Sequence, residues 1–157
     1  MKITLIVVGK TDKKYILEGI AEYEKRLLHY CKIEVKVIPD VKNSKSMSAS
    51  VQMQKEGELI LGAIRSSSEI ILLDERGTEY SSVDFAKFIE KKGISGQREL
   101  SFIIGGPYGF SPEVKSAANV LFSLSRLTFS HQLVRLIFIE QLYRAMTIIK
   151  GEPYHHE

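Results

Sequence analysis

Three groups of residues that could do chemistry lie in the last third of the chain, between Ile104 and Glu157. They read I-G-G-P-Y-G-F-S-P from Ile104, L-S-R-L-T-F-S-H over residues 124–131, and E-P-Y-H-H-E over residues 152–157. Glycines let a backbone approach a ligand, Arg and His bind anions or move protons, and aromatic rings stack on nucleobases. Because chain ends ordinarily fray, a terminus so rich in Tyr and His suggests that it belongs to a site.

The adjacent histidines of this tail, His155 and His156, invite a metal-site interpretation together with Glu152 and Glu157. Neighbouring side chains of an extended segment point apart, however, and no distant Cys/His set completes a tetrahedral site. The sequence therefore predicts no metal. Tyr154 could instead stack on a base, and His155 could act as an acid or base near neutral pH. A simply packed terminus explains these residue types equally well.

The elements that must position these groups alternate between strand and helix patterns. We expect strands at Ile3–Val8, Ile33–Ile38, Glu69–Asp74, Leu100–Ile104 and Val120–Leu124. We expect helices over residues 12–29, 49–65 and 130–149, after the capping box Ser81-x-x-Asp84, and from Ser111-Pro112-Glu113, with a loop over residues 39–48. This alternation predicts one α/β domain, residues 1–157, with a mostly parallel sheet and helices on both of its faces.

Ligands of such sheets bind beyond the carboxyl ends of the strands. Three expected strand ends carry suitable residues, namely 73–75, 105–109 and 125–129. The glycine loop is not G-x-G-x-x-G, so the dinucleotide fingerprint is absent. A tight turn between a strand and a helix accounts for these glycines as readily as a ligand does.

The expected last helix is apolar in nearly every direction, with Glu140, Arg144 and Thr147 as its narrow polar stripe. Such a helix must be buried on all sides, which favours a second subunit packed against it, or else a central position in the core. Glu140 and Arg144 have the spacing of a helix ion pair. Alternatively, Arg144 contacts a phosphate or base of a substrate.

Composition sets further bounds. The chain has 157 residues, 44% hydrophobic and 26% charged, with a net charge of +3 and one cysteine. These values are typical of a globular protein of the cytoplasm, and no apolar stretch approaches the length of a membrane helix. Between Glu113 and Glu140 the sequence has no acidic residue, while it has Lys115, Arg126 and Arg135, which favours an anionic partner.

These motifs together resemble the RlmH family, SPOUT-class methyltransferases that act on pseudouridine in large-subunit ribosomal RNA. The resemblance is carried by I-G-G-P-Y-G, L-S-R-L-T-F-S-H, L-V-R-L-I-F-I-E-Q-L-Y-R-A and P-Y-H-H-E. It is also carried by the starting M-K-I-T-L-I-V-V-G-K, by E-Y-E-K-R at Glu22–Arg26 and by K-E-G-E at Lys55–Glu58. The resemblance spans essentially the whole chain.

The resemblance implies a C-terminal trefoil knot, S-adenosylmethionine as cofactor, and a homodimer. It implies methylation of N3 of a pseudouridine in the intersubunit-bridge hairpin, helix 69, of 23S rRNA on the assembled ribosome. The positions it assigns to the cofactor are Leu73, Gly105, Gly106, Leu124, Ser125, Arg126, Leu127, Thr128 and Phe129. The positions it assigns to RNA are Arg144, Tyr154 and His155, and it allows them to act on the site of the neighbouring subunit.

For the chemical step we expect His155, or a water held by the tail, to take the N3 proton, with Arg144 stabilising negative charge on the adjacent carbonyl oxygens. His131 is a competing base, although a structural hydrogen bond near the start of the last helix is the favoured interpretation. Two other functions remain open: a ribosome-assembly factor that binds RNA or nucleotide without catalysis, and a related methyltransferase with a tRNA target.

Overall fold

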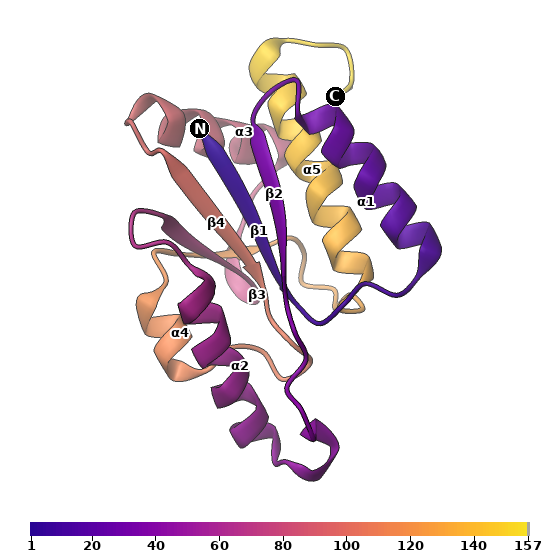
Figure 1. Cartoon of the computed structure of the whole chain (residues 1–157). Coiled ribbons are helices and arrows are strands. Elements are labelled where there is room, and N and C mark those ends of the chain that lie inside the picture. Colours follow the sequence, from indigo (N-terminus) through magenta and orange to yellow (C-terminus); the bar gives the residue numbers. More distant parts are fainter. Residues whose placement is uncertain (157) are drawn as a thin grey trace.

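The computed structural model describes residues 1–156 and has three layers, a central sheet with helices on both of its faces (Figure 1). Within these residues the sheet has five strands in the order β2-β1-β4-β3-β5, and every strand pair is parallel. The expected α/β class is therefore confirmed. The strands are β1 (Lys2–Val8), β2 (Lys32–Ile38), β3 (Glu69–Glu79), β4 (Glu99–Ile104) and β5 (Val120–Ser123).

The helices occur where the sequence predicts them, with ends that shift by a few residues. They are α1 (Lys14–Leu27), α2 (Ala49–Ala63), α3 (Ser82–Ile94), α4 (Pro112–Ala117) and α5 (Leu133–Lys150), and a 3₁₀ turn at Ser44–Ser46 interrupts the expected loop. The predicted N-caps form, because Ser81 Oγ accepts the backbone N–H of Asp84 at 3.1 Å and Ser111 Oγ that of Val114 at 3.4 Å.

Alternate residues of the central strands feed two hydrophobic cores, one on each face of the sheet. Leu5 and Phe102 pack with α1, α3 and α5, whereas Ile6 and Ile103 pack with α2 and α4. β1 and β4 are consequently buried on both faces, as their continuous apolar runs predict. β2 is an edge strand whose burial alternates, and its lysines protect that edge.

Helix α5 lies between α1 and α3 on one face of the sheet (Figure 1). Phe138, Ile139 and Leu142 are fully buried, and further apolar side chains of the helix pack against the same core. The chain itself thus covers most of the apolar surface of α5. The structure shows the alternative, a central position in the core, and the second subunit inferred from this helix stays a prediction.

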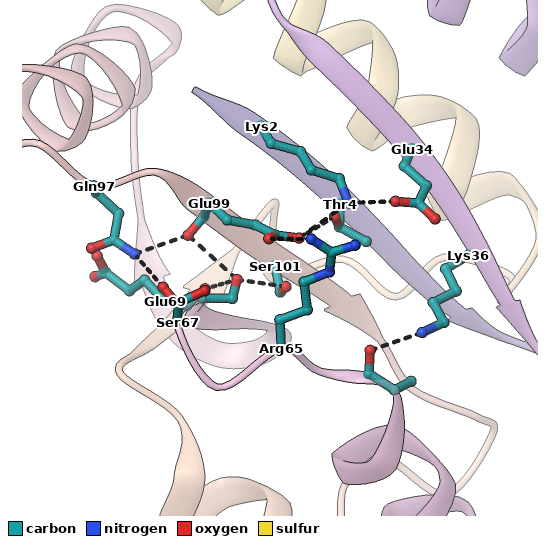
Figure 2. A network of polar contacts seen from close by, with 12 residues as sticks. Lys2, Thr4, Glu34, Lys36, Arg65, Ser67, Glu69, Gln97, Glu99 and Ser101 are labelled. Carbon is teal, nitrogen blue, oxygen red and sulfur yellow. Dashed lines mark hydrogen bonds and ion pairs between the residues drawn. The ribbon is translucent and has the colours of Figure 1, made fainter.

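A polar network joins the strands at the amino end of the sheet (Figure 2). Glu99, 6% exposed at the start of β4, accepts a hydrogen bond from Thr4 Oγ1 at 2.9 Å and faces Lys2 Nζ at 3.4 Å. Lys2 also pairs with Glu34 of β2, and the pKa of the Glu34 carboxyl is lowered by its hydrogen bond with Lys2. This network satisfies the buried carboxylate and fixes three strands at the end opposite the glycine loop.

Strand β3 is longer than predicted because it pairs with β5 in two registers. Leu73 is opposite Phe122, the chain loops out over residues 74–77, and Thr78 is again opposite Phe122. Gly77 makes this possible, since a Cβ there would lie 2.5 Å from the backbone carbon of Leu121. Periodicity alone misses such an irregularity, because the second register depends on contact with a strand some 45 residues later.

Candidate active site

A pocket of about 1120 Å³ opens at the carboxyl ends of β3, β4 and β5. Its lining includes eight of the nine residues that the resemblance assigns to the cofactor: Leu73, Gly105, Gly106, Leu124, Ser125, Leu127, Thr128 and Phe129. Segments that are far apart in the sequence thus meet at the edge of the sheet where parallel strands ordinarily bind ligands.

The glycine loop forms one side of this pocket as a tight turn. Gly106 and Gly109 form a β-bridge, with the Gly109 N–H donating to the Gly106 carbonyl at 3.1 Å, and Gly109 has a φ of +79°. A Cβ on Gly106 would lie 2.3 Å from a carboxylate oxygen of Glu56. The loop is therefore the tight turn that was expected, and because it also lines the pocket, the ligand contact stays a compatible prediction.

The segment after β5 forms the opposite side. Ser125 Oγ accepts the backbone N–H of Leu127 at 3.0 Å, and Leu127 is 73% exposed. Arg126 is the one assigned cofactor residue that does not line the pocket. Its side chain is exposed and lies 3.3 Å from Glu79.

The cations of the acid-poor stretch do not form a free anion-binding surface. Arg135 is 1% exposed and donates to the carbonyls of Val8, Gly9 and His131 and to Thr11 Oγ1, at 2.6 to 3.0 Å. Lys115 lies 3.6 Å from Asp74, and Arg126 lies 3.3 Å from Glu79. Carboxylates of β3 therefore balance Lys115 and Arg126 within the described residues, and the anionic partner expected from this stretch stays a prediction.

His131 lies at the rim of the pocket, just before α5. Its backbone carbonyl accepts from Arg135, but its ring makes no hydrogen bond within residues 1–156, so the favoured structural interpretation of this side chain is wrong. As an exposed imidazole beside the pocket, His131 remains a candidate base.

The tail folds back on α5 and α1 and forms a second cluster. Arg144 Nη2 lies 2.7 Å from Glu140 Oε1, which confirms the expected ion pair, and Arg144 Nη1 lies 3.4 Å from His155 Nδ1. Tyr154 donates to Glu140 Oε1 at 3.1 Å, and the Arg144 guanidinium lies over its ring at 4.8 Å. The three residues expected to contact RNA therefore lie together.

Two tyrosines at the tail, Tyr154 and Tyr30, are hydrogen-bonding groups with raised pKa values. Burial, followed by contacts with Tyr23 and Glu140, raises the pKa of the Tyr154 phenol, and a hydrogen bond to Glu152 raises the pKa of Tyr30. Tyr143 packs edge-on against Tyr154, with ring centroids 4.8 Å apart. The tail is thus a packed terminus, with Arg144 and His155 only partly covered.

The tail cluster and the pocket lie apart within one chain. Val134 lines the pocket, whereas Arg144 lies ten residues further along α5, a rise of about 15 Å. Figure 1 shows α5 running away from the carboxyl ends of the strands, toward the end of the sheet where β1 begins. A single chain does not bring the two predicted halves of the site together.

Sequence reasoning missed the contribution of α2. Met53 lines the pocket, Glu56 is 2% exposed behind Gly106, and Gly57 packs against Ser111. The available signal was K-E-G-E, where a glycine within a helix indicates close packing. A buried glutamate has no signature in hydrophobic periodicity.

The residues present fit S-adenosylmethionine. The pocket is large enough for a nucleoside-sized ligand, its lining mixes apolar side chains with backbone of the glycine loop, and a buried carboxylate behind Gly106 suits a cationic ligand. Residues 1–156 contain no cluster of three or more His, Cys, Asp or Glu side chains suited to a metal. Glu157, which the metal-site interpretation of the tail included, lies outside the described residues. None of the described helices combines the length and apolarity needed to span a membrane.

Comparisons with known proteins identify the family of this chain. A family model described as "Predicted SPOUT methyltransferase" matches residues 1–155. Proteins named "Ribosomal RNA large subunit methyltransferase H" from Parabacteroides distasonis and Porphyromonas gingivalis are each 55% identical to this chain over 157 residues, 100% of both chains. One of the same name from Christiangramia forsetii is 52% identical over 156 residues, 99% of both chains. With a pocket at the expected strand ends and matches over its whole length, the chain belongs to the RlmH family of SPOUT methyltransferases.

Proposed function

We propose that this protein methylates N3 of a pseudouridine in helix 69 of 23S rRNA on the assembled ribosome, with S-adenosylmethionine as methyl donor. The observation that carries the proposal is the pocket, in which residues from three strand ends meet as the family positions require. The printed names of the relatives support the large-subunit rRNA substrate. The reaction would take place in the cytoplasm, where ribosomes are.

In this proposal Leu73, the glycine loop and residues 124–129 hold the cofactor, which supplies a methyl group on a positively charged sulfur. The protein aligns N3 with the S–CH₃ bond, a positioning effect that can contribute about 7–11 kcal/mol. The N3–CH₃ bond forms as the S–CH₃ bond breaks, the bonding electron pair stays on sulfur, and the N3 proton leaves to a base.

The tail supplies the remaining groups. Arg144, held by Glu140 at 2.7 Å and stacked on Tyr154, stabilises negative charge on the carbonyl oxygens beside N3. His155, or a water that it holds, accepts the proton. Tyr154 does not serve as the base, because its raised pKa keeps the phenol protonated at neutral pH.

The separation of pocket and tail supports a homodimer in which each pocket is completed by the tail of the other subunit. The exposed Leu127 and Tyr108, 73% and 54% exposed at the pocket, suit coverage by a partner. We also propose that the single domain, residues 1–157, contains a trefoil knot. The close fit of Gly77 against the backbone of Leu121 and Phe122 is consistent with chain threaded through a tight loop.

The test is incubation of the protein and methyl-labelled S-adenosylmethionine with intact ribosomes, free subunits or tRNA, followed by nucleoside mass spectrometry. We expect label in 3-methylpseudouridine of large-subunit rRNA, and most of it from intact ribosomes. Label found only in tRNA would mean that tRNA, and not large-subunit rRNA, is the substrate. Cofactor binding without methyl transfer to any RNA would contradict the proposed activity. A protein that binds ribosomes without binding the cofactor would be an assembly factor.

A further inference from the structure

The carboxylate of Glu56 is buried beside the pocket without a balancing charge. Its exposure is 2%, and Oε2 has no hydrogen-bond partner within residues 1–156. Oε1 accepts one hydrogen bond, from Gln52 Nε2 at 2.9 Å. No Lys or Arg of the described chain lies within 4.0 Å of it. An unpaired buried carboxylate costs stability, so its presence calls for a function.

The position of Glu56 connects it with the pocket. Oε2 lies 2.3 Å from where a Cβ of Gly106 would be, and Gly106 lines the pocket. Met53, nearly one helical turn before Glu56 on α2, also lines it. Gly57 brings α2 close, since a Cβ there would lie 2.5 Å from Ser111 Oγ. The carboxylate therefore stands directly behind the glycine loop, with only a hydrogen atom as the side chain of Gly106 in front of it.

The other acidic groups at the pocket are compensated or hydrated. Asp74 lies 3.6 Å from Lys115 and accepts the backbone N–H of Arg76 at 2.9 Å, while Glu75 is exposed. Charge in a desolvated position acts over several ångströms, whereas water screens an exposed charge. Among the described residues, Glu56 is thus the acidic group at this pocket whose negative charge is least balanced by cations and least screened by water.

We propose that Glu56 is a specificity-determining residue that makes the pocket prefer the cationic sulfonium cofactor to its neutral thioether product. S-adenosylmethionine and S-adenosylhomocysteine differ by a methyl group and one positive charge, and shape alone separates them poorly. A fixed negative charge behind Gly106 favours the cation and so promotes release of the spent cofactor after transfer. This inference rests on the proposed function, because it presupposes that cofactor.

The test compares ligand binding by calorimetry for the wild type, Glu56→Gln and Glu56→Met. The ligands are S-adenosylmethionine, S-adenosylhomocysteine and sinefungin, an analogue with a charged amine in place of the sulfonium. In both variants we expect the Kd of the two cationic ligands to rise about fivefold or more, and the Kd of the neutral product to change by less than about twofold. Glu58→Gln, an exposed site on the same helix, is the matched control and should bind like wild type.

Thermal unfolding of the ligand-free protein supplies a second readout at one fixed protein concentration. Because both substitutions remove an unpaired buried charge, we expect Tm to rise by about 3 °C. Equal weakening of all three ligands, a lower Tm, or unchanged binding would each overturn the inference, since Glu56 would then only shape the loop or do nothing. Wild-type protein that binds none of the ligands would overturn the proposed function as well, which separates the two failures.

Discussion

Arg144→Ala is expected to reduce single-turnover methylation of ribosomes by about 100-fold or more, while the Kd for S-adenosylmethionine changes by less than about twofold. The Arg144 guanidinium is fixed by Glu140 at 2.7 Å and by the Tyr154 ring at 4.8 Å, and it is about 15 Å along α5 from the pocket of its own chain. Its loss removes a preorganised cation from the tail that is proposed to face the RNA, without disturbing the residues proposed to hold the cofactor.

Four further variants serve as comparisons for this result. Arg98→Ala removes an exposed arginine elsewhere and should retain full activity. Arg144→Lys keeps the charge but loses the planar fork, so we expect an intermediate rate. Comparing His155→Ala with His131→Ala identifies the base, because the variant that lacks the base should have the lower methylation rate at a saturating concentration of ribosomes. If Arg144→Ala and His155→Ala both react at wild-type rates with unchanged binding, the roles assigned to the tail are wrong.

The second large effect concerns stability. Arg135→Met is expected to lower the free energy of unfolding by about 3–5 kcal/mol, because it strands the buried carbonyls of Val8 and Gly9 that the guanidinium now satisfies at 2.6 and 2.9 Å. Burial lowers the pKa of Arg135, with Asp40 and Asp12 opposing that shift. The side chain joins the end of β1 to the start of α5, directly behind the loop that forms one side of the pocket.

Urea denaturation at one fixed protein concentration measures this loss. Arg126→Met is the matched control, because Arg126 is exposed and pairs only with Glu79 among the described residues, and should change stability by less than about 0.5 kcal/mol. If the free energy of unfolding of Arg135→Met lies within about 1 kcal/mol of the wild-type value, the four hydrogen bonds of Arg135 do not hold this junction together.

Local patterns in the sequence were sufficient to predict the fold class. Continuous apolar runs identified β1 and β4, and cap residues placed the starts of α3 and α4. Strand order, the two registers of β3 and the burial of Arg135 depend on contacts between distant segments, which composition and periodicity do not contain. The same limit explains why the sequence did not show that α1 and α3 cover much of α5, since both helices are remote from it in sequence.

The site was predictable to a similar degree. Strand ends and family motifs assigned nine positions to the cofactor, and eight of these line the pocket. Glu56 was not identified, because a glutamate on a helix is ordinarily exposed and only the approach of Gly106 reveals its burial. Sequence patterns also do not predict the separation of the tail from the pocket, because it depends on the direction of α5 relative to the strands.

Complementation in a defined heterodimer tests most directly whether pocket and tail from different subunits form one active site. Thr128→Trp fills the pocket, and Arg144→Ala disables the tail. Two differently tagged chains, one with each substitution, are co-expressed, and the heterodimer is purified and assayed on ribosomes. If sites form between subunits, one intact site remains and the heterodimer should show about half of wild-type activity, while either homodimeric variant is nearly inactive. If the tail serves the pocket of its own chain, both sites carry a defect, and an inactive heterodimer would contradict the account.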